Sequence, residues 1–451
     1  MIYRKILKSI ENFYNNNRNK ALLITGARQI GKTYIIREYG KKNYKNFVEI
    51  NFIENNYAKD IFNDFVDTKD LLTRLSAITS MPMIEGETLI FFDEVQECKN
   101  IVTAIKFLVQ DSNFNYILSG SLLGVDLQDI KSIPVGYMDI MQMFPLDFEE
   151  FIIANGVSNI VIDSLKKSYE NKNKVDLVVH NKMLDLFRLY LIVGGMPYVV
   201  EEYINSYNIK NVVEKQRFIT NLYKKDITKY DPLNKLYIED IFSVIPSELN
   251  AKNKRFIMKN LNENFKFSRY KNSFLWLKEA GVALPVFCAN EPVIPLVLSK
   301  STNLFKLFLS DVGLLSSMYM NNIQIKILKK EKDINFGAVY ENAVAQELVA
   351  HGFNTFYFNS KKQGEIDFLI EHNANILPVE IKSGKDYSKH SALSNILNNE
   401  AYKIDRGIVL YNGNVEIIDK IEYLPIYMIM FIKNDSINDE LYYKIDLSEL
   451  M

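Results

Sequence analysis

Short apolar runs alternate with helical stretches in the first third of the chain. Runs of this length, bounded by polar turns, suit the buried central strands of a parallel α/β sheet. Helices are expected to begin at Lys32, Ala58, Asp70 and Asn100. The candidate strands are residues 21–25, 47–52, 88–93, 116–119 and 137–141. The pattern therefore predicts a parallel sheet with covering helices.

Beyond residue 144 the pattern is mainly helical, and a mixed pattern follows. Residues 184–203 read as a helical region that Gly194, Gly195 and Pro197 interrupt. The two glycines at this break favour a tight backbone contact over chemistry. Further on, two helices at 250–261 and 268–280 and a proline-broken strand pair at 282–297 have the order of a winged helix-turn-helix.

The last portion of the chain reads as a helix followed by a mixed set of strands. The segment around residues 372–375 has the polar character of a turn between two strands. The expected elements are a helix at 338–351, strands at 365–370 and 377–381, a helix near 391–397, and strands at 407–411 and 425–431.

A phosphate-binding loop follows the first candidate strand. Residues 26–33 fit the pattern G-x-x-x-x-G-K-[ST] in full: Gly26, Ala27, Arg28, Gln29, Ile30, Gly31, Lys32 and Thr33. The glycines let successive backbone N–H groups face a phosphate, and the new helix adds its positive end. Lys32 is expected to reach the β- and γ-phosphates of ATP, and the Thr33 hydroxyl to bind Mg²⁺.

Two carboxylates end the third strand, where the second half of such a site is expected. Asp93 is predicted to hold Mg²⁺ through water, and Glu94 to orient and polarise the attacking water. The next strand ends in Ser119, Gly120 and Ser121. These hydroxyls suit a sensor of the γ-phosphate, and an ordinary helix cap by Ser121 explains them equally well.

Arginine is absent between Arg74 and Arg188. The second half of the predicted nucleotide-binding domain therefore supplies no arginine finger. Arg28, Arg37 and Arg74 remain candidates, and so do residues of later domains. Hydrolysis without such a charge is slower by about 10³–10⁵ in systems that use one. We expect slow turnover, more typical of a switch than of a motor.

The order of several segments resembles a bacterial and archaeal family of AAA-type ATPases. The segments are GARQIGKT, LIFFDEVQE, ILSGS, FPLDFEEF, VGGMPYVV, YKKDITKY, FKLFLSDVGLL, GAVYENAVAQEL and GEIDFLIEHNANILPVEIKSG. Members carry a C-terminal domain whose later part looks like a restriction-endonuclease fold. The resemblance implies that Gly26, Gly31, Lys32, Thr33, Asp93 and Glu94 occupy nucleotide-site positions. Members usually have a basic residue where this chain has Gly136-Tyr137, which reinforces the expectation of weak turnover.

A second set of charged residues lies in the last portion. Glu380 and Lys382 share one face of a strand, and Asp367 on the preceding strand is placed to lie across from it. Asp367 and Glu380 suit a divalent metal, Lys382 suits a water-positioning role, and Glu341 on the preceding helix is a further candidate ligand. The arrangement resembles the PD-(D/E)xK nucleases. Exposed charges on a hairpin are the alternative.

Basic residues gather among aromatic residues in the middle of the chain. A winged helix would present them to a DNA backbone, and a solvated helix face explains them as well. The basic residues are Lys252, Lys254, Arg255, Lys259, Lys266, Arg269 and Lys271, and the aromatic ones are Phe256, Phe265, Phe267 and Tyr270.

Length and composition fit a multidomain protein with no overall charge bias. The chain has 451 residues, a formal net charge of -1 and two widely separated cysteines. A net charge near zero excludes a global attraction to nucleic acid, and the cysteines exclude a disulfide scaffold. The predicted domains are an AAA-type P-loop ATPase domain (1–165), a helical and winged-helix-like region (166–325) and a PD-(D/E)xK nuclease-like domain (326–451). The fold class is α/β.

These observations predict an ATP-binding, ATP-hydrolysing switch coupled to a DNA-binding, nuclease-like C-terminal half. The alternative is a nucleotide-gated scaffold whose C-terminal half binds DNA or protein without cleaving. A third interpretation is a signalling ATPase that has a protein partner and does not bind DNA. The predicted cofactors are ATP and Mg²⁺. The partner classes left open are DNA, another protein and a second copy of the chain. No stretch suits a membrane span or signal peptide, so we expect a cytoplasmic protein.

Overall fold

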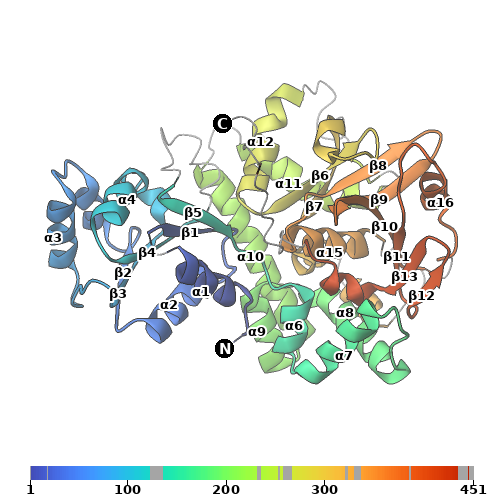
Figure 1. Ribbon diagram of the computed structural model, residues 1–451, viewed down its shortest axis with the longest axis horizontal. Coiled ribbons are helices and arrows are strands. Elements are labelled where there is room, and N and C mark those ends of the chain that lie inside the picture. The colour runs from blue at the N-terminus through green and yellow to red at the C-terminus, as the bar shows by residue number, and fades with distance from the viewer. Residues whose placement is uncertain are drawn as a thin grey trace.

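The computed structural model shows an N-terminal sheet domain, a helical region and a second, larger sheet (Figure 1). It describes residues 2–17, 19–121, 136–230, 235–251, 254–256, 267–319, 323–329, 337–384, 387–434 and 445. The N-terminal sheet lies on the left of Figure 1 and the second sheet on the right, with the long helix α10 (Ile209–Tyr230) between them.

The first sheet is fully parallel, with strand order β2-β3-β4-β1-β5. Its strands are β1 (Ala21–Thr25), β2 (Asn46–Asn51), β3 (Thr88–Asp93), β4 (Asn115–Ser119) and β5 (Met138–Gln142). The helical elements of this domain are α1 (Ile6–Asn16), α2 (Lys32–Asn43), η1 (Asn56–Phe62), α3 (Thr68–Ile78), η2 (Val95–Glu97) and α4 (Asn100–Asp111). All five strands and the four helix starts lie within two residues of their predicted positions, although the element near Ala58 is a 3₁₀ helix. Because the strands are parallel, their carboxyl ends meet at one edge.

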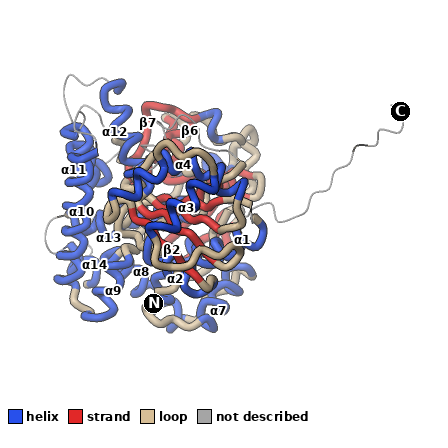
Figure 2. Tube along the Cα trace, turned by 90° about the vertical axis from the view of Figure 1, so that its left-hand side faces the viewer, coloured by secondary structure: helices blue, strands red, loops and turns tan. Residues whose placement is uncertain are grey.

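The helical region begins after β5. Its helices are α6 (Phe148–Ala154), α7 (Asn159–Glu170), α8 (Leu177–Val193), α9 (Pro197–Ser206), α10, α11 (Lys235–Asn250), α12 (Phe267–Glu279), α13 (Val312–Met318) and α14 (Ile323–Leu328). Figure 2 shows α9 to α12 along one side of the molecule. The helix α8 stops at Gly194, whose φ of 72° is left-handed. A Cβ on Gly195 would lie 2.0 Å from the Leu146 carbonyl oxygen, so the predicted tight backbone contact is confirmed.

The second sheet has eight strands in the order β12-β13-β11-β10-β9-β8-β6-β7, with parallel and antiparallel pairs. The strands are β6 (Ala283–Ala289), β7 (Lys300–Leu309), β8 (Phe356–Ser360), β9 (Gly364–His372), β10 (Asn375–Lys382), β11 (Gly407–Tyr411), β12 (Glu416–Ile418) and β13 (Ile421–Pro425). Helices α15 (Gly337–Ala350) and α16 (Ser391–Leu397) and the 3₁₀ helices η5 (Leu296–Ser299) and η6 (Ile426–Phe431) accompany it. The predicted fold class is confirmed: a parallel P-loop sheet precedes a helical region and a mixed-sheet domain.

Two sequence interpretations need correction. The strand pair expected at 282–297 is an antiparallel pair, but its second strand starts at Lys300 and the pair extends the eight-stranded sheet instead of forming a separate wing. The strand expected at 425–431 is the 3₁₀ helix η6, buried from Ile426 to Met430. A short apolar run does not distinguish a buried strand from a buried helical turn. Most of the helix expected at 250–261 lies outside the described residues.

A shared apolar core joins the two sheets. Leu22 and Ile24 on one face of the first sheet belong to the same buried cluster as Val379 and Leu410 in the second. The helix α15 strengthens this connection, because the buried Glu347 carboxylate accepts hydrogen bonds from the backbone of Phe148 (2.8 Å) and the hydroxyl of Tyr190 (3.0 Å). The opposite face of the first sheet and the outer face of the second have separate cores.

Candidate nucleotide-binding site

The loop between β1 and α2 has the backbone that a phosphate cradle requires. Gly26 and Gly31 have φ angles of 136° and 90°, and Gln29 is also left-handed at 65°. A Cβ on Gly26 would lie 2.2 Å from the Met143 carbonyl oxygen, so only glycine fits there. Lys32 is 9% exposed, and its ammonium donates hydrogen bonds of 2.8 Å to the carbonyls of Gly26 and Ala27. The ammonium therefore lies against its own loop.

Asp93 is the centre of a polar cluster at the carboxyl ends of three strands. Its carboxylate accepts hydrogen bonds from the Thr33 hydroxyl at 3.0 Å, the Asn51 side-chain amide at 3.1 Å and the Ser119 hydroxyl. Asp93 is buried, and this burial raises its pKa even though the Ser119 and Thr33 hydroxyls oppose the shift. The parallel sheet thus brings Thr33, Asp93 and Ser119 together as the sequence predicted, and it adds Asn51.

Glu94 follows Asp93 in an uncommon backbone conformation. Its φ is 56°, a left-handed value that costs a non-glycine residue energy and that clusters at functional sites. Its side chain accepts a hydrogen bond from the Gln96 amide at 2.5 Å, and its backbone N–H donates to Asp93 at 3.1 Å. Glu94 is thereby held beside the Asp93 cluster.

The loop is also held by residues that lie far from it in the sequence. Arg4, which precedes α1, donates to the Ile30 carbonyl at 3.0 Å, and the Tyr223 hydroxyl of α10 donates to the Arg28 carbonyl at 3.1 Å. A Cβ on Gly281, between α12 and β6, would lie 2.9 Å from the Ala27 nitrogen. The phosphate loop is therefore in contact with the helical region at several points.

The side chain of Arg28 connects the loop to α10. Its guanidinium forms an ion pair with Asp226 of α10 and donates to the Ser121 hydroxyl at 3.1 Å. Ser121 lies just beyond β4, close in sequence to the Asp93 partner Ser119. The other candidate arginines are paired away from the loop, Arg37 with Glu49 and Arg74 with Asp70. Arg28 is thus the candidate cation that lies at the loop.

Residues 18–152 match a family described as an AAA domain. This part of the chain is an AAA-type P-loop domain. Residues 184–325 and 336–429 match two domains of unknown function, DUF8612 and DUF4143. No curated protein is similar enough in sequence to count as a relative.

Several solved structures resemble the chain in outline. The Walker-type ATPase PabY2304 of Pyrococcus abyssi is 14% identical, with 71% of this chain and 96% of that one covered and a TM-score of 0.43. The RuvB Holliday junction branch migration motor of Thermotoga maritima is 11% identical, with coverages of 63% and 89% and a TM-score of 0.29. The ORC1 protein of Aeropyrum pernix, solved in complex with DNA, is 13% identical, with coverages of 73% and 95% and a TM-score of 0.30. Scores this low support no further assignment.

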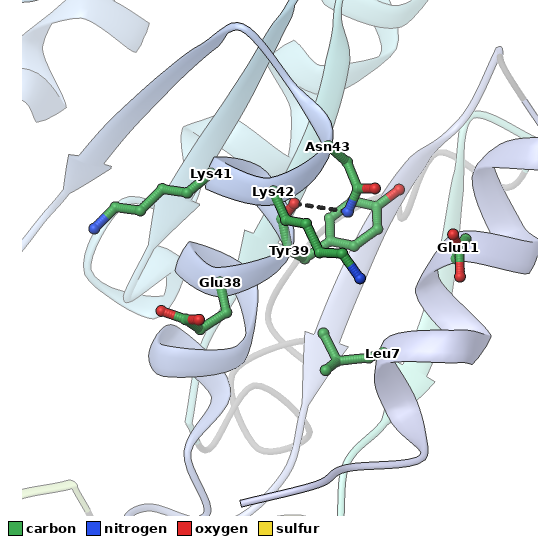
Figure 3. A pocket seen from close by; sticks show the side chains of 7 residues that line it. All are labelled: Leu7, Glu11, Glu38, Tyr39, Lys41, Lys42 and Asn43. Carbon is green, nitrogen blue, oxygen red and sulfur yellow. Dashed lines mark hydrogen bonds between the residues drawn. The ribbon is translucent and has the colours of Figure 1, made fainter. Parts of the chain in front are cut away.

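A surface pocket of the AAA-type domain lies away from the phosphate loop (Figure 3). It is lined by Leu7 and Glu11 of α1 and by Glu38, Tyr39, Lys41, Lys42 and Asn43 of α2. Lys32 begins α2 and the pocket residues end it, which separates them by roughly 10 to 15 Å at 1.5 Å per residue. The pocket has no part in the phosphate site.

The predicted charged residues of the C-terminal domain also come together. The Asp367 carboxylate accepts the backbone N–H of Ile381 at 2.9 Å, and Lys382 donates to Glu380 at 2.8 Å. Glu341 on α15 interacts electrostatically with both Asp367 and Glu380. Burial and the neighbouring Asp367 raise the pKa of Glu380 to about 8. Their roles as metal ligands and catalytic groups stay predictions.

Two lysines that the sequence analysis did not assign to this site also lie within the carboxylate group. Lys306 of β7 is fully buried, with its ammonium 2.8 Å from Glu365 and 3.7 Å from Glu341. Lys254 also contacts Glu341. Lys306 is a charge inside the apolar run NLFKLFL, and that was the available sequence signal.

The predicted basic face is only partly described by the structure. Lys252, Lys259 and Lys266 lie outside the described residues, and the side chains of Arg269 and Lys271 are not described. Lys254 points to Glu341 and is therefore engaged within the protein. DNA binding by this region stays a prediction.

No helix within the described residues is both long and apolar enough to cross a membrane. The longest, α10, has 22 residues and carries many charged side chains. The expected absence of a membrane partner and the cytoplasmic location stay predictions.

Proposed function

We propose that the chain is an ATP-binding and ATP-hydrolysing switch whose phosphate loop communicates with the C-terminal half. The observation that supports it is the gathering of Lys32, Thr33 and Asp93 around the glycine loop of the AAA-type domain. Loop amides and the Lys32 ammonium hold the phosphates, and Glu94 orients the attacking water. Asn51 and Ser119 fix the Asp93 carboxylate in place.

Mg²⁺ is the cation that this proposal implies, and the residues present fit it. Thr33 and Asp93 provide a hydroxyl and a carboxylate that already lie 3.0 Å apart. Oxygen donors in small number, together with water and phosphate, are what Mg²⁺ takes in nucleotide sites. The bound ion supplies neutralisation of phosphate charge. Thr33 and Asp93 are the residues that would hold it.

Replacing Lys32 with alanine tests the proposal directly. We expect ATP affinity to fall about 10- to 100-fold, which corresponds to the loss of a charge-assisted hydrogen bond of about 1.5–3 kcal/mol. Isothermal titration calorimetry with ATP and Mg²⁺ measures the affinity. The control is Lys41→Ala, because Lys41 is an exposed lysine on the same helix. Equal ATP affinity in wild type and Lys32→Ala would remove the proposed function.

ATP affinity is expected to depend on pH through the same lysine. Burial lowers the pKa of Lys32 to about 8, while Glu94 and Asp93 act in the opposite direction. Below pH 8 the side chain is an ammonium ready for phosphate, and above pH 8 it must first take up a proton. Affinity therefore falls as pH rises above 8, by up to about tenfold per pH unit.

Calorimetry between pH 6.5 and 9.5, in buffers of different ionisation enthalpy, measures both the affinity and the proton uptake. In Lys32→Ala the remaining affinity should lose this dependence. A wild-type affinity that stays level up to pH 9.5 contradicts the assignment of the proton to Lys32.

The switch character of the proposal is supported by the contacts of Arg28. Its guanidinium lies between Ser121 of the AAA-type domain and Asp226 of α10, so a phosphate at the loop competes with Asp226 for one cation. The helix α10 packs against α9, α11 and α13. A phosphate that draws Arg28 away from Asp226 would therefore alter a contact of α10 in the helical region. The stretch without arginine between Arg74 and Arg188 supports slow turnover.

For the C-terminal half, we favour a binding role for DNA or a protein over cleavage. Lys254 and Lys306 support a binding role, because they pair with the carboxylates that a catalytic metal ion would need. Domain boundaries near residues 165 and 325 remain part of the proposal. The boundary near 325 leaves β6 and β7 on one side and the other six strands of their sheet on the other side. A boundary at this position therefore cuts through the eight-stranded sheet.

A further inference from the structure

The carboxylate group of the second sheet contains a lysine in its middle. Lys306 is 0% exposed, and its ammonium lies 2.8 Å from Glu365, 3.7 Å from Glu341 and 4.0 Å from Asp367. The ring of Tyr357 lies on another side, with its centroid 5.1 Å from the ammonium. Three carboxylates and an aromatic face therefore surround one cation.

The strand that carries Lys306 fixes this arrangement. Phe305 and Leu307 are buried on either side of it in β7, and both belong to the main apolar core. Because neighbouring residues of a strand point to opposite faces, Lys306 is directed away from these two side chains. The ammonium is fully buried, and it stays charged because its nearest partners are carboxylates.

Two further lysines offset much of the negative charge around Lys306. Lys254 contacts Glu341 on its other oxygen, and Lys382 pairs with Glu380 at 2.8 Å. Three ammonium groups thus serve four carboxylates, those of Glu341, Glu365, Asp367 and Glu380. Burial raises the pKa of both Glu341 and Glu380, which lessens the negative charge further.

The metal implied by the nuclease resemblance does not fit this group. A divalent cation needs carboxylate oxygens at about 2.0–2.6 Å, and it would enter beside an ammonium that lies 3.7 Å from a Glu341 oxygen and 4.0 Å from an Asp367 oxygen. Across the described part of the chain, no three histidine, cysteine, aspartate or glutamate side chains are placed to hold a metal ion. The Lys306 ammonium therefore opposes a second cation at Glu341 and Asp367 through charge repulsion.

We infer that Lys306 is a built-in counter-ion that replaces a divalent metal in the C-terminal domain. The acidic residues there hold β7, β9 and α15 together through this ammonium. The domain therefore takes no catalytic cation and acts by binding. This inference is independent of ATP binding at the AAA-type domain, so either can fail without the other.

Manganese binding to the full chain tests the inference without nucleotide present. Electron paramagnetic resonance of free Mn²⁺ measures the bound fraction in wild type, Lys306→Met, Lys306→Met/Asp367→Asn and Asp367→Asn. Methionine keeps the length of the lysine stem and removes its charge. We expect Lys306→Met to gain one Mn²⁺ site at least about tenfold tighter than any in wild type, and the double variant to lose it. Lys300→Met is the matched control, since Lys300 lies in the same strand against the Phe287 ring and away from the carboxylates.

Two results would overturn the inference. One is a Mn²⁺ site in wild type that Asp367→Asn removes, or DNA cleavage by wild type that depends on both a divalent cation and Asp367. The other is a folded Lys306→Met that gains no Mn²⁺ site. Circular dichroism establishes whether Lys306→Met is folded. If it is not, the comparison of wild type with Asp367→Asn still decides, because binding that depends on Asp367 contradicts the inference and its absence supports it.

Discussion

We expect Glu94→Gln to lower the steady-state rate of ATP hydrolysis by about 10²–10⁴-fold, the range that a positioned general base supplies. Glutamine has the same shape but cannot accept a proton from water. Lys32, Thr33 and Asp93 are untouched, so ATP affinity stays close to that of wild type. Phosphate release measures the rate and calorimetry measures the affinity.

Glu97→Gln provides the matched control for this experiment. Glu97 follows the same strand but lies 3.6 Å from Lys59, away from the Asp93 cluster. We expect it to hydrolyse ATP at the wild-type rate. If Glu94→Gln also keeps the wild-type rate, another group orients the water. If both variants slow equally, the effect comes from local structure and not from base catalysis.

Asp311→Ala destabilises the fold by about 3–5 kcal/mol, the second large effect that we expect. Its buried carboxylate accepts the backbone N–H of Gly195 at 2.6 Å and that of Leu314 at 2.9 Å. Alanine leaves both donors buried without an acceptor, at about 1–3 kcal/mol each, and removes the N-cap of α13. The midpoint of urea unfolding, followed by the fluorescence of Trp276, measures the loss.

The control for Asp311→Ala is another helix cap with solvent access. Asp176 caps α8 by accepting the N–H groups of Val178 and Val179, and it is exposed. Asp176→Ala should cost only about 1 kcal/mol. Equal midpoints for the two variants would show that burial of the Asp311 contacts adds nothing.

The candidate nucleotide site was predictable where its chemistry is local in sequence. The loop from Gly26 to Thr33 needs glycines, a lysine and a hydroxyl at fixed spacing, and the structure gives it the expected strand and helix. Asn51 was not predictable, because an asparagine at the end of a strand is ordinary until the sheet order places it beside Asp93. Tyr223 and Asp226 depend on how α10 packs, which no short pattern encodes.

The C-terminal domain shows the same division between local and long-range information. The hairpin of β9 and β10 was expected from its polar turn, and so was the shared face of Glu380 and Lys382. Lys306 is separated from Asp367 by 61 positions in the sequence and meets it only because of the strand order. The same strand order explains why the expected wing is part of the sheet.

The two glutamates of α15 have a consequence for how such sequences are interpreted. Glu341 meets Lys306 and Lys254, while Glu347, six residues later, receives hydrogen bonds from Phe148 and Tyr190. About 9 Å of helix thus connects the ion cluster to α6 and α8 of the helical region. Buried acidic residues of this kind can hold helices and strands together without any catalytic role. Such acidic residues in a sequence indicate how helices and strands pack together. Before a nuclease is inferred from them, the chain should be checked for a buried lysine that faces them.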